Sequence, residues 1–226
     1  MTNARLSLLG REAQRLRSLL TRVDWPAMPS ERGATLLALM DQLDASQWWS
    51  ADALLTHQLH QATLLLRHSR STVPYYRDRL AANPIPSSGT LSFAAYRDLP
   101  TLTRRDVQDA GTALHSRSLD PSFGATFAMN TSGSTGEPVR LLATDLDRLF
   151  WEALTMRDHD WHGRDFTRGL ASIRANVVAT GIPDPLPDWG MPTSELCSTG
   201  PAYALSSSTD FAVQTDWLRR HRPEYL

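Results

Sequence analysis

Six consecutive residues combine hydroxyl side chains and glycine in an order that suits phosphate binding. They are Thr131, Ser132, Gly133, Ser134, Thr135 and Gly136. Glycine adopts positive φ angles, so successive backbone N–H groups can point into one concavity, and small hydroxyl groups add donors without filling it. A solvated turn has a similar composition, so both interpretations remain open at this point. The spacing of a Walker loop and its lysine are absent, which excludes that class of phosphate site.

The segments on either side of this loop are apolar. Residues 125–129 and 139–143 predict two strands that enter and leave it. Thr144 or Asp145 is then expected to cap a helix. The apolar residues of that helix are Leu149, Phe150, Ala153, Leu154 and Met156. The loop is therefore expected between two strands, with a helix directly after them.

Composition sets limits on the class of protein. The chain has 226 residues, 41% of them hydrophobic, which is enough for a sizeable core. Its net charge of −1 gives no overall field for nucleic acid or an anionic membrane. The single Cys197 fits a reducing compartment, and no apolar run is long enough for a membrane span or a signal peptide, so a cytoplasmic location is expected. All 23 basic side chains other than histidine are arginines.

The first third of the chain reads as helical. An apolar stripe from Leu6 through Leu16 and Leu20 to Val23 predicts an amphipathic helix, which packs on the domain or on a partner and suggests self-association through residues 6–23. Ser30 is expected to cap a second helix, and Pro74 to open a short one. Between them, residues 51–70 predict a helix with an inner face of Leu54, Leu55, Leu59, Ala62, Leu65 and Leu66.

The later part of the chain predicts an alternation of strands and helices. Thr103 is expected to cap a helix that Gly111 ends. Residues 170–173, 176–179 and 202–205 predict short strands, and residues 181–190 an irregular loop. Thr209 or Asp210 is expected to cap a helix that runs to His221. Strand, polar loop and helix in this order are typical of a layered α/β sheet domain.

Two histidine groups are candidate metal ligands. His57, His60 and His68 share one predicted helix, and the segment 159–165 holds two histidines and two aspartates. Neither group has the complete ligand set of a zinc site, and solvated or helix-ending roles explain the same residues. No metal site is therefore assigned, and no catalytic residue. The segment 159–165 could alternatively line a nucleotide or acceptor pocket.

Three stretches together resemble a known family. Thr-Ser-Gly-Ser-Thr-Gly-x-Pro at 131–138 is similar to the phosphate loop of the adenylate-forming (AMP-binding) enzymes. The segments 65–77 (Leu-Leu-Arg-His-Ser-Arg-Ser-Thr-Val-Pro-Tyr-Tyr-Arg) and 99–107 (Leu-Pro-Thr-Leu-Thr-Arg-Arg-Asp-Val) resemble its phenylacetate-CoA ligase branch, including the capsular-polysaccharide-associated relatives. The resemblance covers roughly residues 50–226 and corresponds to the N-terminal portion of such an enzyme.

The resemblance implies an ATP-dependent, AMP-forming carboxylate ligase that passes the acyl group to CoA or another thiol. Thr131, Ser132, Gly133, Ser134, Thr135 and Gly136 would then hold the β- and γ-phosphates of ATP, with Mg²⁺ sharing the charge. An aromatic acid is the substrate that this branch suggests. The family's later adenine and ribose motifs have no counterpart here, and its lid lysine is absent. The chain alone is therefore expected to be inactive.

The resulting expectation is an α/β fold, incomplete at its C-terminus. Residues 1–82 form a helical region and residues 91–226 the first part of a layered adenylate-forming domain, with the loop 83–90 between them. The end at Leu226 is expected to interrupt the domain, since a further strand should follow. The alternative is a non-catalytic binding or assembly module derived from such an enzyme.

Overall fold

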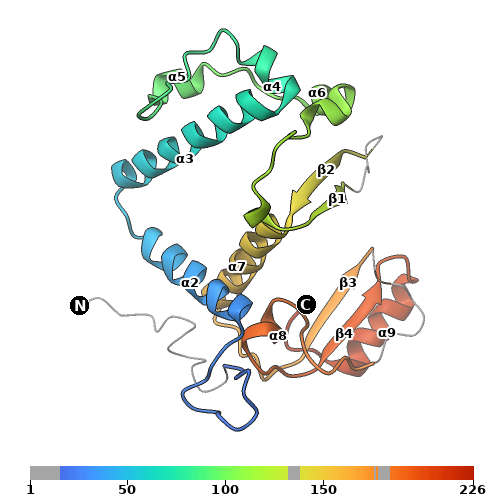
Figure 1. Ribbon diagram of the computed structural model, residues 1–226. Coiled ribbons are helices and arrows are strands. Elements are labelled where there is room, and N and C mark those ends of the chain that lie inside the picture. Colours follow the sequence, from blue (N-terminus) through green and yellow to red (C-terminus); the bar gives the residue numbers. More distant parts are fainter. Residues whose placement is uncertain (1–15, 132–137, 176, 178–183) are drawn as a thin grey trace. The chain divides into compact units, whose positions relative to one another are not determined.

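A computed structural model describes residues 16–131, 138–175, 177 and 184–226 (Figure 1). Helices and two two-stranded sheets make up this part of the chain, so the expected mixed α/β class is confirmed. The chain divides into two compact units. The first unit combines the chain up to Asp44 with Phe150–Leu226, and the second is Ala45–Leu149.

Local capping signals set the helices of the second unit. Helix α3 (Ala51–Thr72) begins where Ser50 Oγ accepts a hydrogen bond from Ala53 N at 3.2 Å. Helix α4 (Pro74–Arg79) has Pro74 in its first turn, as predicted. Thr103 and Asp106 form a reciprocal capping box at the start of α6 (Arg104–Ala110), as the sequence predicts for Thr103. The remaining elements are α5 (Phe93–Arg97) and the 3-10 helices η2 (Gly111–Leu114) and η3 (Pro121–Phe123).

The buried side of α3 differs in part from the predicted inner face. Leu54 and Leu65 are exposed, with 38% and 63% of their surface accessible, whereas Thr63 is fully buried. The Thr63 hydroxyl accepts a hydrogen bond from Leu91 N at 2.9 Å and donates one to Leu59 O at 2.6 Å. A polar side chain is stable in this position because both of its hydrogen-bonding roles are fulfilled. The inclusion of Leu54 and Leu65 in the inner face was wrong.

The loop 83–90 is irregular, as predicted, yet it does not separate two units. Arg67, on α3, donates to Pro86 O at 2.7 Å and to Gly89 O at 2.6 Å. Together with the bond from Leu91 to α3, these contacts hold the loop inside the second unit. The division of the structure therefore falls at 44/45 and 149/150, and the expected boundary between residues 82 and 91 lies within one unit.

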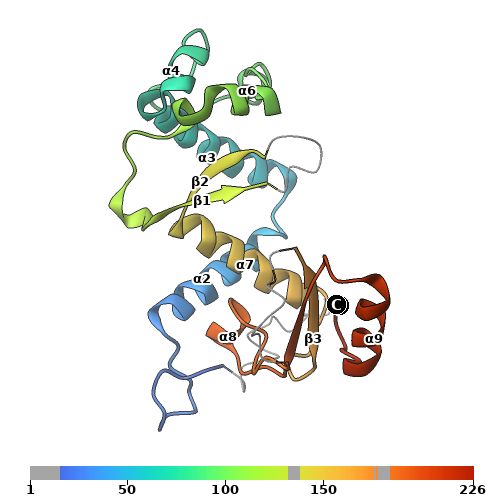
Figure 2. The ribbon, with the colours of Figure 1, turned by 90° about the vertical axis from the view of Figure 1, so that its right-hand side faces the viewer.

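The first unit contains a parallel strand pair with a helix on one face. Strand β3 (Leu170–Arg174) pairs in parallel with β4 (Ala202–Ser206), and a bridge from Leu170 to Tyr225 runs parallel on the other side of β3. Helix α9 (Phe211–His221) begins at Asp210, whose carboxylate accepts from Ala212 N at 2.8 Å. It lies beside the two strands (Figures 1 and 2). The predicted strands 170–173 and 202–205 are confirmed, while most of 176–179 lies outside the described residues.

The core of the first unit is mainly apolar, and at its edge the buried Glu152 forms an ion pair with the half-exposed Arg32. Helix α2 (Glu31–Ser46) starts at Ser30, whose Oγ accepts from Gly33 N at 2.9 Å, as predicted. Glu152, 6% exposed on α7 (Asp145–Trp161), accepts from Arg32 at 2.6 Å. The short helix α8 (Thr193–Leu196) completes the elements of this unit. Its buried apolar side chains are Leu36, Met40, Ala153, Met156, Phe166, Ala171, Trp189, Leu196, Cys197, Ala202 and Trp217.

The predicted N-terminal helix is wrong over its described part, residues 16–23. Leu16 forms an antiparallel bridge with Cys197, and Arg17 N donates to Leu196 O at 2.7 Å. Leu19 N donates to Met28 O at 2.6 Å, so the backbone turns back on itself. These bonds replace the i to i−4 ladder that a helix requires. Residues 6–15 of the stripe lie outside the described residues. Because residues 16–23 are not helical, they give no support to self-association through a helix over residues 6–23.

Within the described residues, every helix is too short or too polar to pass through a bilayer.

Candidate functional site

A β-hairpin carries the sequence-predicted phosphate loop. Strands β1 (Thr126–Asn130) and β2 (Arg140–Thr144) are antiparallel, with Asn130 directly opposite Arg140. Both predicted strands are confirmed, each shifted by one residue toward the C-terminus. Of the predicted site residues, Thr131 is described, while Ser132, Gly133, Ser134, Thr135 and Gly136 lie outside the described residues.

Thr131 closes the end of this hairpin. Its backbone N–H donates to Val139 O at 3.0 Å, and its Oγ1 accepts from Val139 N at 3.0 Å. The Thr131 amide is thus engaged by the hairpin, and only the hydroxyl proton of this residue is left to offer to a ligand.

The other end of the hairpin is attached to α7 by short polar contacts. Asp145 N donates to Ala125 O at 3.0 Å, and the Asp145 carboxylate accepts from Ala125 N at 2.8 Å. Thr144 and Asp147 form a second capping box, which assigns the helix cap to Thr144. Arg148 lies over the Phe127 ring at 4.3 Å. These contacts therefore join the strand pair to the start of α7 (Figure 2).

A cavity of about 570 Å³ lies beside the end of the hairpin that carries the loop. We call it the hairpin cavity. Residues of α6, the glycine that ends α6 and the ends of both strands line it. Its described lining residues are Val107, Gln108, Gly111, Asn130, Pro138 and Arg140. Its size is in the range of small-molecule sites. Among these lining residues Arg140 carries the charge, which is positive.

Asn130 and Arg140 project from the same face of the hairpin. Directly opposed residues of an antiparallel pair share a face, while Met129 and Leu141, one position away, share the other. No carboxylate of the described residues forms an ion pair with Arg140. The cavity therefore has on one wall a carboxamide and a guanidinium that pairs with no carboxylate of the described residues, and both groups can donate hydrogen bonds to an anion.

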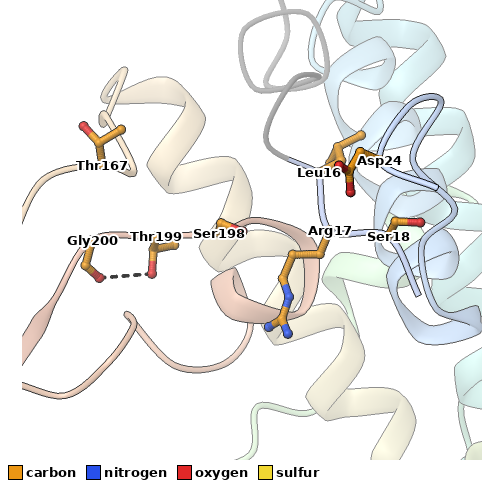
Figure 3. Close-up of a pocket in the computed structure, with 8 residues that line it drawn as sticks. All are labelled: Leu16, Arg17, Ser18, Asp24, Thr167, Ser198, Thr199 and Gly200. Carbon is orange, nitrogen blue, oxygen red and sulfur yellow. Dashed lines mark hydrogen bonds between the residues drawn. The ribbon is translucent and has the colours of Figure 1, made fainter. Parts of the chain in front are cut away.

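A second cavity, of about 660 Å³, belongs entirely to the first unit (Figure 3). It contains both Arg17 and Asp24, and Arg17 Nη1 already donates to Ser194 O at 2.5 Å. Several hydroxyl groups line it, among them Thr199, which donates to Gly200 O at 3.2 Å. The opposite charges balance, so this cavity has no electrostatic preference for a polyphosphate.

A third cavity, of about 510 Å³, surrounds the end of α7 in the first unit. His159 is buried there, and its Nδ1 accepts from Arg164 Nη1 at 2.7 Å. Burial, assisted by the Arg164 charge, lowers the pKa of His159 to about 4, so the imidazole is neutral at pH 7 with its proton on Nε2. The Arg164 hydrogen bond lowers the pKa of Asp158.

The sequence interpretation of the segment 159–165 as a helix end agrees with this arrangement. Helix α7 ends at Trp161, and Gly163 has a φ of 58°. His159 has aromatic neighbours, with the Trp189 ring at 5.5 Å and the Phe166 ring at 5.7 Å. In the part of the chain that the structure describes, no three potential ligands gather around a metal position. His159 also lines the third cavity, which leaves the pocket interpretation open.

Comparisons with known proteins give no family assignment. None of the models of known protein families matches the chain, and no curated protein matches it either. The resemblance to adenylate-forming enzymes therefore depends on the sequence motifs alone.

Sequence reasoning missed the walls of the hairpin cavity. Gln108, Asn130 and Arg140 were not among the predicted site residues, although Asn130 and Arg140 lie within one and four residues of the loop. The alternation of the two strands could have indicated that these two share a face. The approach of α6 to the hairpin has no signal in the sequence.

Proposed function

We propose that this chain is the N-terminal part of an ATP-dependent, AMP-forming carboxylate ligase, similar to phenylacetate-CoA ligase, and holds the nucleotide phosphates. In this reaction a carboxylate attacks the α-phosphate of ATP, pyrophosphate leaves, and the acyl group passes from the adenylate to CoA or another thiol. The segment Thr131–Gly136 contacts the β- and γ-phosphates, and Mg²⁺ shares their charge. The acid would be aromatic if this chain follows the branch it resembles.

The observation that supports this proposal best is the position of the motif. A hydroxyl- and glycine-rich segment joins two paired strands, a capped helix follows directly, and a cationic cavity lies beside the strand ends. A polar surface turn requires no such cavity. The Arg140 guanidinium and the Asn130 carboxamide in this cavity are donors that an anion bound next to the motif could use.

Activity is assigned to the complete enzyme rather than to this chain. The sequence contains no lysine, so the lid lysine that contacts the reacting carboxylate in this family must come from elsewhere. We therefore expect this chain to bind Mg·ATP without forming acyl-adenylate.

A non-catalytic assembly module is the second candidate. Met129 and Leu141, which share one face of the hairpin, expose 50% and 48% of their surface. Exposed apolar side chains that cluster on a short hairpin favour burial against another protein segment. In this case the chain would bind a partner and show no affinity for ATP.

Calorimetric titration of the whole chain with Mg·ATP distinguishes the two candidates. The proposal predicts saturable binding that falls about 100-fold or more when two loop hydroxyls are removed in Ser134→Ala/Thr135→Ala, the loss expected for two hydrogen bonds to charged groups. The matched control is Ser87→Ala/Ser88→Ala, in an exposed loop of the same unit, and should leave binding unchanged. Absence of Mg·ATP binding by the unmodified chain would overturn the ligase proposal.

A further inference from the structure

We propose that Arg140 is the residue that neutralises the nucleotide's terminal phosphates, and that these phosphates occupy the hairpin cavity between β2 and α6. This inference rests on the proposed function and assigns one specific cation to it. The site is built from described residues alone: Arg140 and Asn130 on the hairpin, with Gln108 and Val107 on α6 opposite them.

The position of Arg140 follows from the register of the hairpin. Arg140 is the first residue of β2 and lies across from Asn130, the last residue of β1. Side chains at opposed positions are about 5 Å apart at Cβ, so the guanidinium and the carboxamide can contact one bound group together. Both line the cavity.

Arg140 differs from three nearby arginines in its charge partners. Arg79, Arg105 and Arg148 lie on the elements around the hairpin, and each pairs with a carboxylate, at 3.4, 3.5 and 3.9 Å. Arg140 has no such partner among the described residues, and no acidic side chain is among the described lining residues of the cavity. A cation that faces a cavity and has no carboxylate partner among the described residues attracts an anionic ligand.

The chemistry of arginine matches a phosphate group. The planar guanidinium presents a fork of N–H donors that binds two phosphate oxygens at once, which a point charge does not reproduce. Since the chain has no lysine, a side chain of this chain that carries a permanent positive charge to a polyphosphate has to be an arginine. A cavity of about 570 Å³ has room for a triphosphate tail.

The test measures binding of three probes to the whole chain by calorimetry: Mg·ATP, tripolyphosphate and adenosine. Arg140→Gln should weaken Mg·ATP and tripolyphosphate roughly 10- to 100-fold, as expected for loss of a charge-assisted bidentate contact, and leave adenosine unchanged. Arg140→Lys keeps the positive charge but not the forked donors, so its affinity for Mg·ATP and tripolyphosphate should lie between that of the unmodified chain and that of Arg140→Gln. Arg105→Gln removes the same charge from α6, where Arg105 pairs with Asp109, and should change binding less than about twofold.

The results distinguish the assignment of Arg140 from the proposed ligase function. If the unmodified chain binds Mg·ATP and Arg140→Gln binds it equally well, the assignment of Arg140 is wrong while the proposed function stands. If the unmodified chain binds neither Mg·ATP nor tripolyphosphate, both the assignment of Arg140 and the proposed function are wrong. Binding of acetate that is lost in Arg140→Gln, with tripolyphosphate unaffected, would make the cavity a carboxylate site and overturn the assignment. Arg140→Lys guards against a folding artefact in Arg140→Gln, since it retains a long cationic side chain on the exposed strand.

Discussion

Asp145 contacts both Gly124 and Ala125, the two residues directly before β1. Its backbone N–H and carboxylate both bond to Ala125, and its side chain lies directly against Gly124. Gly124 has a φ of +77°, a conformation that glycine adopts without the strain imposed by a Cβ. The entry of the chain into β1 therefore depends on the absence of a side chain at residue 124.

A substitution at Gly124 tests this contact. In Gly124→Ala, the new Cβ would lie 2.7 Å from Cβ and Oδ2 of Asp145, which cannot move without losing the bond to Ala125. Gly89→Ala is the matched control, since its φ is +73° and no atom lies within 4 Å of the added Cβ. We expect urea unfolding to show an additional loss of about 1–3 kcal/mol in Gly124→Ala, from overpacking. Equal losses in the two variants would exclude a steric role for Asp145.

His159 gives the first unit a defined pH dependence. Its pKa is about 4 in the folded chain and 6.5 when unperturbed, so between these values the unfolded chain binds a proton that the folded chain does not. Stability must therefore fall as pH falls from about 6.5 to about 4, by at most about 1.4 kcal/mol per pH unit. Asp158 has a lowered pKa, so its contribution is present above its ordinary value of 3.8 and is lost at lower pH.

The variant His159→Gln isolates this effect, because glutamine keeps an acceptor for Arg164 and does not titrate. Urea midpoints at pH 7 and pH 4.5 should differ less in His159→Gln than in the unmodified chain. An identical pH dependence would mean that the imidazole remains solvated in the folded state.

At the scale of elements, the passage from β2 into α7 is controlled by Thr144. Its hydroxyl accepts from Asp147 N at 3.2 Å, and its backbone N–H donates to the Asp147 carboxylate at 2.7 Å. Because β2 and α7 are adjacent in sequence, this cap also fixes the C-terminal end of the hairpin. The hairpin has only two strands and largely exposed faces, so it depends on such attachments.

Removing the cap should destabilise the hairpin together with the helix. Thr144→Ala is expected to cost about 1 kcal/mol, the typical value for loss of an N-cap hydroxyl, and Thr144→Ser should restore most of it. Thermal denaturation followed by circular dichroism measures both. A Thr144→Ser variant as unstable as Thr144→Ala would show that the methyl group, rather than the hydroxyl, is what matters.

At the scale of the whole molecule, the two units should respond separately to a local defect. Thr63 is fully buried in the second unit and accepts from Leu91 N. Thr63→Val keeps the shape of the side chain and leaves that N–H without a partner, a change that costs about 1–3 kcal/mol.

Hydrogen exchange by mass spectrometry locates the effect. In Thr63→Val, amide exchange should accelerate within residues 45–131 and stay unchanged within 184–226, because these residues belong to different compact units and local opening is confined to one cooperative unit. A matching acceleration in both regions would show that the two units unfold as one.

The sequence by itself determined the features that depend on neighbours a few residues apart. Ser30, Pro74, Thr103 and Asp210 begin helices as predicted, because a cap bonds to an amide two or three residues away. The strands around the loop were predicted to within one residue, since their apolar segments are bounded by turn residues.

Tertiary structure decided what depends on residues far apart in the chain. The segment 16–23 has a helical pattern, yet its backbone bonds to Leu196 and to Met28, partners that no local pattern reveals. Thr63 is buried because Leu91 reaches it, and Arg140 lines a cavity because α6 lies opposite the hairpin. Long-range contacts select among conformations of similar local free energy, so they override a periodicity that is consistent with more than one of them.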